Sequence, residues 1–426
     1  MKLFLKLCCA VFALFLPYSV SFADVLSIEP NSVEAQAWII VDPETKQVIA
    51  QHQSDAQRAP ASLTKMLVAY IALKEIAAGR LDRHEVLTAT PVVNQVMSDE
   101  SQMYLKVGEQ ISVDQLLAGL IVMSANDAAV TLAERISGSV PAFVQRMNQE
   151  AQALKMHNSH FQNPAGVTMP EHYSTAEDLA KLAQAIVTQT PQYLTYSKLT
   201  SFSYKDHYHK ATNLLLQKDP SVDGLKTGFT RAAGYNLALT ANRTLENGQQ
   251  RRLIVIVMGT NSALKRAEVA HNLLNLAYVY TQHETLFQAK QLLAQIPVLK
   301  SNVKFFSVTA KQPIVVTTSL YNQKKAINLK DFDSAQQRLF VLQNEQKIWI
   351  EPATKTDILF NIHLLEKSFT APIHQTEKVA TIDVYQHQQL ISRIDVEQNI
   401  ELREANFFEK IWLWFQAWMS QFSTAK

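Results

Sequence analysis

Cysteine is rare in this 426-residue chain, which contains only two. Both, Cys8 and Cys9, lie within the first 23 residues, where a basic start, an apolar run and a small-x-small pattern ending at Ala23 predict a cleaved export signal. The expected mature chain begins near Asp24. It therefore has no disulfide and no thiol available for catalysis.

Long apolar runs and an excess of charge are also lacking. The apolar run of the signal, residues 7–16, is too short to span a bilayer. The chain has 40 Lys and Arg against 38 Asp and Glu, and loss of Lys2 and Lys6 with the signal leaves 38 of each. Since no basic stripe is present either, nucleic acid is not an expected partner.

Residues 24–286 mix strand and helix patterns, which predicts an α+β domain with helices around a mostly antiparallel sheet. Ser174 and Glu177 form an apparent capping box at the start of one helix. The expected strands and helices are a hairpin over 37–52, strands at 235–243 and 251–259, and helices over 66–78, 126–138, 174–187 and 263–280. The helix over 66–78 is apolar on all sides, so it should be buried at the centre of the domain.

The sequence changes character after residue 286. Short β-rich runs separated by turn signals continue to about residue 402, without a convincing helix among them. This pattern predicts a small all-β domain over residues 287–402.

The last segment, residues 403–426, is expected to form an amphipathic helix. Its apolar face consists of Phe407, Phe408, Ile411, Trp412, Trp414, Phe415, Trp418, Met419 and Phe422. The helix could dock on the β domain, but aromatic residues this dense favour an interfacial helix that anchors the protein to a membrane. Because its polar face is not basic, attachment should depend on apolar burial more than on anionic lipid.

A Ser-x-x-Lys pattern occurs four times, beginning at Ser62, Ser262, Ser301 and Ser423. Only the first has a plausible catalytic setting, because Pro60 precedes Ser62 and Lys65 falls one turn along the same face of a helix. At a helix N-terminus the hydroxyl would lie near free N–H groups. The alternative is that Ser62 is only an N-cap and Lys65 a snorkelling side chain.

Two further motifs favour the catalytic interpretation. Ser124-Ala125-Asn126 lies in a turn before a helix, and Lys226-Thr227-Gly228 lies at the start of an expected edge strand. Taken singly, Ser124 could be another cap and the second motif a solvated turn. In this order and spacing the three motifs match the penicillin-recognising serine enzymes.

The chain resembles the low-molecular-mass penicillin-binding proteins that are D-alanyl-D-alanine carboxypeptidases, serine peptidase family S11. The resemblance includes PASLTKM, SANDAAV, HFQNPAG and VDGLKTGFTRAAGYNL, and it covers nearly the whole chain. It implies a penicillin-binding/β-lactamase-like catalytic domain, followed by the β domain and the helix. It also implies an exported enzyme at the periplasmic face of the inner membrane, which removes the terminal D-alanine from peptidoglycan pentapeptide stems without cofactor or metal. β-Lactams would be covalent inhibitors, and the role would lie in cell-wall remodelling and cell shape.

The resemblance and the chemistry together suggest a role for each motif. Ser62 would be the nucleophile and Lys65 its base, directly or through a relay, with Lys226 as the cation that lowers the Lys65 pKa. Ser124 would pass a proton to the leaving amine, and Asn126 would hold the backbone amide of the substrate.

The remaining assignments concern substrate binding. The N–H groups of Ser62 and Phe229 would form the oxyanion hole. Thr227 or Thr230, beside Gly228 on the same strand, would bind the terminal carboxylate together with Arg266. Arg266 could instead be a surface residue of a helix. The run from Asp206 to Lys210, DHYHK, lacks a third metal ligand at useful spacing and is expected to be a solvated loop.

Three other functions compete with this interpretation. A class A β-lactamase would need a Glu-x-x-Leu-Asn run between Asn126 and Lys226, and none is present. A transpeptidase or endopeptidase has nearly the same chemistry. A catalytically silent peptidoglycan-binding scaffold is disfavoured because the residues of all three motifs are intact.

Overall fold

The computed structural model describes residues 22–245, 248–322, 324–343 and 346–423. Residues 1–21 of the expected export signal, with both cysteines, lie outside them. The chain divides into two compact units. The first unit is Asp24–Glu284 with Val315–Thr356, and the second includes Thr285–Ile314 and Asp357–Lys426.

The first unit is built on a five-stranded antiparallel sheet with the order β2-β1-β9-β8-β7. Its strands are β1 (Ala37–Asp42), β2 (Gln47–His52), β7 (Val222–Thr230), β8 (Gly234–Thr244) and β9 (Gln250–Thr260). The predicted hairpin and the predicted pair of neighbouring strands are therefore confirmed. β7 is an edge strand, as expected, but the Lys-Thr-Gly motif lies in its interior, since strand pairing begins four residues before Lys226.

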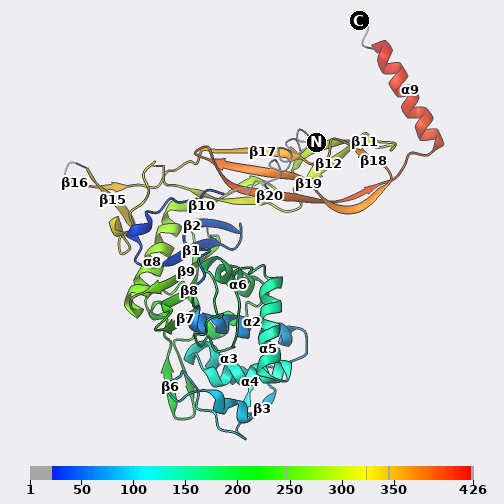
Figure 1. Ribbon diagram of the computed structural model, residues 1–426. Helices are drawn as coiled ribbons and strands as arrows, with labels where there is room; N and C mark the ends of the chain where they lie inside the picture. The colour runs from blue at the N-terminus through cyan, green and yellow to red at the C-terminus, as the bar shows by residue number, and fades with distance from the viewer. Residues whose placement is uncertain (1–21, 246–247, 323, 344–345, 424–426) are drawn as a thin grey trace, which may run out of the picture. The chain divides into compact units, whose positions relative to one another are not determined.

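Both faces of the sheet are buried, because alternate side chains of one strand enter different cores. Ile39 and Val41 of β1 belong to one core cluster, whereas Trp38 and Ile40 belong to the other. α8 (Ala263–Tyr280) covers the second face, and α2 (Thr64–Ala77) and α6 (Ala176–Gln189) lie on the first (Figure 1). Helices on an antiparallel sheet confirm the predicted α+β class.

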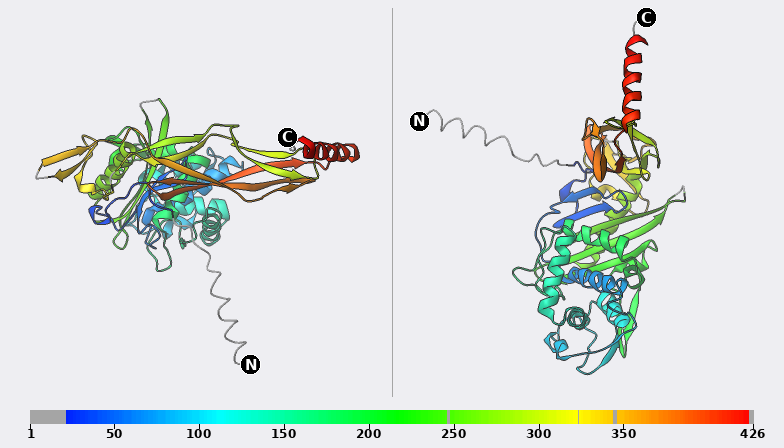
Figure 2. Two further views of the ribbon diagram at one scale, coloured as in Figure 1. Left: turned by 90° about the horizontal axis from the view of Figure 1, so that it is seen from above. Right: turned by 90° about the vertical axis from the view of Figure 1, so that its right-hand side faces the viewer.

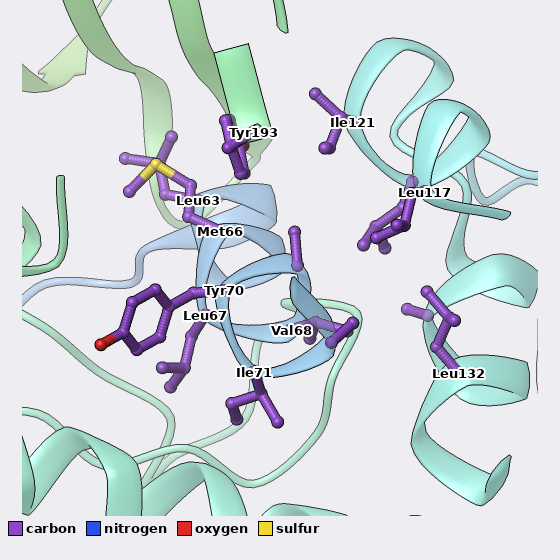
Figure 3. Close-up of a cluster of buried hydrophobic side chains, with 14 of the residues drawn as sticks. Leu63, Met66, Leu67, Val68, Tyr70, Ile71, Leu117, Ile121, Leu132 and Tyr193 are labelled. Atoms are coloured by element: carbon purple, nitrogen blue, oxygen red, sulfur yellow. The ribbon is translucent and has the colours of Figure 1, made fainter. Parts of the chain in front are cut away.

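α2 is the central helix of the larger core (Figure 3). Its side chains are buried around the whole circumference, as its apolar sequence predicts. Leu63, Met66, Tyr70 and Ile71 point outward from it in different directions, toward the surrounding helices and strands (Figure 3). The helix that carries the candidate base is thus held rigidly from all sides.

The other helices of this unit enclose the same core. They are α3 (Val113–Ala118), α4 (Asn126–Ser137), α5 (Val140–Ala153) and α7 (Tyr193–Ser197). α4 ends at Gly138, as predicted, and this glycine is in the left-handed conformation. The capping box predicted for α6 is wrong: Thr175, not Ser174, is the N-cap and accepts a bond from the Asp178 N–H. The Glu177 N–H instead bonds to the carbonyl of Ser54.

The β-rich segment that follows α8 does not form one unit. Tyr280 of α8 donates to the carbonyl of Ile350 and accepts from the Leu339 N–H, so residues 315–356 pack with the first unit. The sequence places this segment in the second domain instead, because its strands have the same local pattern. The small strands of the first unit are β3 (Val86–Thr88), β4 (Gln110–Ser112), β5 (Ser201–Tyr204), β6 (His207–Lys210), β14 (Phe332–Asp333), β15 (Arg338–Gln343) and β16 (Gln346–Ile350).

The second unit consists of strands followed by one helix, α9 (Phe407–Ser423), which lies beyond the last strand (Figure 2). β17 (Ile358–Leu364), β19 (Ile373–Gln386) and β20 (Gln389–Leu402) form one sheet, and β11 (Leu292–Leu299), β12 (Phe305–Thr309) and β18 (Phe369–Thr370) form another. β10 (Thr281–Phe287) and β13 (Ile314–Ser319) lie where the chain passes between the units. None of the helices that the structure describes is long and apolar enough to cross a membrane.

Candidate active site

The turn that carries Ser62 leads directly into α2. A short 3-10 turn (η3, Ala61–Leu63) holds the serine, and the cap position of α2 is Leu63, which makes no side-chain capping bond. Ser62 is therefore not the N-cap of the helix, so that alternative is wrong. Asn236, fully buried in β8, donates from Nδ2 to the carbonyls of Ala59 (3.1 Å) and Pro60 (3.2 Å) and so attaches this turn to the sheet.

Lys65 is the hydrogen-bond partner of Ser62. Its Nζ lies 3.0 Å from Ser62 Oγ and 2.5 Å from the carbonyl oxygen of Ala165, and the residue is only 1% exposed. The alternative of a snorkelling lysine is thus wrong as well. Burial lowers the pKa of Lys65 to about 7, against the opposing charges of Glu100 and Asp127. A lysine with this pKa can accept a proton near neutral pH.

The Ala165 carbonyl is presented by a turn that Asn163 shapes. Asn163 Oδ1 accepts bonds from the N–H groups of Gly166 (2.7 Å) and Val167 (3.0 Å). A Cβ on Gly166 would overlap the carbonyl oxygen of Ala61, so glycine lets this turn approach the serine closely. The segment HFQNPAG contributes to the resemblance, but no role for Asn163 follows from its local pattern.

Lys226 lies on β7 and is also buried, with Nζ donating to the carbonyl of Thr227 at 2.9 Å. Burial, followed by the charges of Lys65 and Arg266, places its pKa well below the usual value. The low pKa of Lys65 is likewise due first to burial. Because Lys226 itself resists protonation, it is a weaker depressing cation than the sequence suggests.

Ser124 and Asn126 stand between two helical segments. Ser124 is in the left-handed region (φ 62°) at the end of a π-helical turn (η5, Gly119–Met123), and it is 8% exposed. The N-cap of α4 is Ala125, without a side-chain bond, so Ser124 is not the N-cap of this helix. The backbone N–H of Asn126 donates to the Ser101 carbonyl at 2.7 Å, and its side-chain Nδ2 donates to the Glu100 carboxylate.

Sequence reasoning misses the loop that contributes Glu100. Asp127, 1% exposed, accepts bonds from the N–H groups of Met103 (2.9 Å) and Leu105 (3.0 Å) and so fixes this loop to the start of α4. The only sequence signal is that Asp127 directly follows Asn126 in the first turn of a helix, where acidic residues are common.

Four of the predicted substrate-binding residues follow Lys226 along β7. A Cβ on Gly228 would lie 3.1 Å from Ser62 N, so glycine allows the strand to run close to the nucleophile turn. Thr227 and Thr230 share hydroxyl hydrogen bonds with Thr212 and with Thr168, respectively, the latter at 2.9 Å.

Phe229 is half exposed on β7 and stacks on Tyr235 of β8 at 4.3 Å between ring centroids. The Arg266 guanidinium lies over the Tyr235 ring of this pair, 5.6 Å from the ring centroid. The Phe229 side chain thus lies at the surface of the strand, one residue after Gly228, which runs close to the nucleophile turn.

Arg266 lies in the first turn of α8 and is 5% exposed, so it is not a surface residue. Its guanidinium donates to three backbone carbonyls: Thr212 at 3.1 Å, Gly228 at 3.3 Å and Asn236 at 3.4 Å. Burial lowers its pKa to about 10. Arg266 thus holds the backbone of β7 through its hydrogen bond to Gly228. Its positive charge is fixed beside the Lys-Thr-Gly motif.

The DHYHK run forms the turn and second strand of the β5/β6 hairpin, where His207 stacks on Tyr104 at 4.5 Å. The expected solvated loop is therefore a hairpin. In the described part of the chain, no group of three or more His, Cys, Asp or Glu residues is placed to hold a metal ion.

Known proteins share this sequence and arrangement. A family model described as D-alanyl-D-alanine carboxypeptidase, peptidase S11, matches residues 24–262. The chain belongs to this family. It is 31% identical to D-alanyl-D-alanine carboxypeptidase DacD of Salmonella typhimurium over 405 residues, which cover 93% of each chain. The predicted recognition is thus confirmed.

Solved structures of relatives agree. Penicillin binding protein 5 from Haemophilus influenzae superposes with a TM-score of 0.73 at 25% identity, over 88% of this chain and 100% of that chain. Penicillin-binding protein D2 from Listeria monocytogenes, solved in an ampicillin-bound form, is similar to 57% of this chain over 96% of its own, with a TM-score of 0.50 at 29% identity. The chain therefore has the penicillin-binding protein fold.

Proposed function

We propose that this protein is a serine-type D-Ala-D-Ala carboxypeptidase that removes the terminal D-alanine from peptidoglycan pentapeptide stems through an acyl-enzyme on Ser62. The observation that carries the proposal is the 3.0 Å contact between Ser62 Oγ and Lys65 Nζ, together with a Lys65 pKa of about 7. A serine hydroxyl becomes a nucleophile when an adjacent base accepts its proton.

Acylation begins when neutral Lys65 takes the Ser62 proton and Ser62 Oγ attacks the carbonyl between the two D-alanines. Negative charge then develops on the carbonyl oxygen, which accepts hydrogen bonds from the backbone N–H groups of Ser62 and Phe229. The short distance that Gly228 permits between β7 and the Ser62 turn supports this pair of donors.

Collapse of the tetrahedral intermediate breaks the bond between the carbonyl carbon and the nitrogen of the leaving D-alanine. Ser124 passes the proton held by Lys65 to that nitrogen, and D-alanine leaves as the free amino acid. Water then attacks the ester, with the same groups acting in reverse, and releases the shortened peptide and Ser62.

Binding of the substrate places a carboxylate beside β7 and a backbone amide beside Asn126. Thr227 or Thr230 would hydrogen-bond the terminal carboxylate, and the buried charge of Arg266 favours an anion there, although its own hydrogen bonds go to carbonyls. Lys226, whose pKa burial places well below its usual value, adds a hydrogen-bond donor at this end of the site.

β-Lactams are proposed as covalent inhibitors, because their strained amide presents the same carbonyl to Ser62. The Listeria relative was solved with ampicillin and with cefotaxime bound. We further propose an exported protein at the periplasmic face of the inner membrane, held there by α9, with a role in cell-wall remodelling and cell shape. Eight described aromatic and aliphatic side chains of α9 are exposed, which supports the anchor.

The test uses the mature chain, fluorescent penicillin and a pentapeptide ending in D-Ala-D-Ala. The wild type should be labelled covalently and should release D-alanine, whereas Ser62→Ala should do neither. Ser262→Ala is the matched control, since Ser262 also begins a Ser-x-x-Lys pattern but caps α8 through the Lys265 N–H at 3.1 Å. Labelling should survive in this control. Absence of both labelling and D-alanine release in the wild type would overturn the proposal.

A further inference from the structure

Besides Asp127, a second carboxylate lies in this site. Glu100 is half-buried and accepts a hydrogen bond from Nδ2 of Asn126. Its negative charge also acts on Lys65. None of the three sequence motifs includes this residue, and the reaction steps above do not use it.

The loop that carries Glu100 is firmly attached to the residues around it. The next residue, Ser101, accepts the backbone N–H of Asn126, and Asp127 holds the N–H groups of Met103 and Leu105. Asn126 is therefore joined to this loop by its backbone, through Ser101, and by its side chain, through Glu100. A freely moving surface carboxylate would lack these restraints.

The hydrogen bond determines which way the Asn126 amide faces. An ionised carboxylate only accepts hydrogen bonds, so the nitrogen of the amide, not its oxygen, must face Glu100. Asn126 Oδ1 is then left without a partner among the residues that the structure describes. That oxygen is an acceptor suited to the backbone N–H of a peptide substrate or of a β-lactam side chain.

We propose that Glu100 is a positioning residue of this active site, which holds the Asn126 amide with its oxygen available to the substrate and balances the charge around Lys65. The proposal rests on the proposed function of the site. It goes beyond the motif residues, because Glu100 belongs to none of the three motifs. Glu100 sets the orientation of the Asn126 side chain and influences the protonation of Lys65.

Several charged groups face Lys65, and their effects differ in sign. Glu100 from the loop and Asp127 from α4 favour its protonated form, whereas burial opposes it. The charge of Lys65 in turn lowers the pKa of Lys226 on β7. Burial lowers the pKa of His172 to about 4, so this ring is neutral at physiological pH. Removing the Glu100 charge should therefore let Lys65 lose its proton at lower pH.

Three variants of the mature chain separate the two effects. Glu100→Gln keeps an oxygen that can accept from Asn126 but removes the charge, and Glu100→Ala removes both. Asp99→Asn is the matched control, since Asp99 is the neighbouring carboxylate and is exposed. The measurement is the rate of acylation by fluorescent penicillin between pH 5 and 9, with the melting temperature of each variant.

We expect Glu100→Gln to keep its maximal rate within about threefold of wild type, with the acid limb of the profile shifted down by at least about half a pH unit. Glu100→Ala should lose about tenfold or more of its maximal rate, because the amide of Asn126 is no longer oriented. Asp99→Asn should match the wild type in rate and profile.

A wild-type acid limb in Glu100→Gln, or a shift to higher pH, overturns the charge role, and a wild-type maximal rate in Glu100→Ala overturns the orienting role. If Glu100→Ala proves less stable, its rate is no longer a clean test. The isosteric Glu100→Gln, measured on folded protein, then decides the charge role by its acid limb. If the wild type is labelled and Ser62→Ala is not, failure at Glu100 leaves the proposed function intact.

Discussion

The side-chain nitrogen of Lys65 lies 3.0 Å from the hydroxyl oxygen of Ser62; Ser62 belongs to the short turn before α2, and Lys65 to the first turn of that buried helix. The helix is held on all sides, so the distance between nucleophile and base does not depend on a mobile loop. Burial of the same helix removes water from Lys65 and lowers its pKa.

The pH dependence of acylation follows from this lysine. Below a pH of about 7 Lys65 is protonated and cannot accept the Ser62 proton, so the acylation rate should rise as the pH increases through about 7. Lys65→Arg should abolish labelling at every pH below 10, because arginine stays protonated. The rate of penicillin labelling, measured against pH, checks both. A flat profile between pH 5 and 9 would show that Lys65 is not the titrating base.

Two glycines with the same φ angle allow a test of the Ser62 turn. Gly166 and Gly108 both have φ +84°, but a Cβ on Gly166 would overlap the Ala61 carbonyl, whereas a Cβ on Gly108 would meet nothing within 4 Å. Gly108→Ala should cost about 1–2 kcal/mol for its left-handed conformation. Gly166→Ala should cost at least about 2 kcal/mol more and should slow acylation, because it displaces the turn that holds Ser62.

Urea unfolding and the labelling rate measure these two effects. If Gly166→Ala is no less stable than Gly108→Ala and is acylated at the wild-type rate, the close approach of the two turns is unimportant.

A buried ion pair joins strands β1 and β9 of the sheet. Arg251 and Asp42 are nearly inaccessible to solvent, and Arg251 Nη2 lies 3.1 Å from Asp42 Oδ2. Arg251→Met should destabilise the first unit by about 3 kcal/mol, because Oδ2 of the buried Asp42 loses its guanidinium partner and keeps only His283 (2.7 Å) and Thr317 (3.2 Å). The control is Arg83→Met, which breaks the exposed pair with Asp114 and should cost no more than about 1 kcal/mol.

Adding Asp42→Asn to Arg251→Met should recover part of the lost stability, because the uncompensated charge is then removed. Thermal unfolding of the single and double variants measures this recovery. Equal stability losses in Arg251→Met and Arg83→Met would contradict the importance of burial.

Local sequence signals were sufficient for much of the fold. α8 occupies the expected residues 263–280, because Ser262 provides an ordinary cap and a long helical pattern follows. β8 and β9 alternate between two buried faces and were recognisable as neighbouring strands. Long elements with a strong hydrophobic pattern can be predicted from their local sequence alone.

Other features depend on contacts between distant residues. Ala165 accepts from Lys65 across 100 residues, and Glu100 accepts from Asn126 across 26 residues. A carbonyl oxygen has no residue-type signature, and an isolated glutamate in a polar loop resembles any solvated residue. Residues 315–356 were missed for a similar reason. They have the same local pattern as the second domain, so only long-range contacts show that they pack with the first unit.

The last prediction concerns α9. Trp412, Trp414 and Trp418 of this helix are 60%, 68% and 44% exposed, although aromatic side chains are costly to leave in water. A mature chain that ends at Ala405 should remain in the supernatant after centrifugation with neutral lipid vesicles, whereas the full chain should sediment. Because apolar burial is the expected cause, sedimentation of the full chain should persist at 1 M salt, where the Debye length is about 3 Å.

Replacement of the three tryptophans by glutamine should release the full-length chain as well, and replacement of Glu409 and Lys410 on the polar face should not. Penicillin labelling in solution should be unchanged by truncation, because Ser62 and Lys65 belong to the first unit. If the truncated chain still sediments with vesicles, or if 1 M salt releases the full chain, the apolar face of α9 is not the anchor.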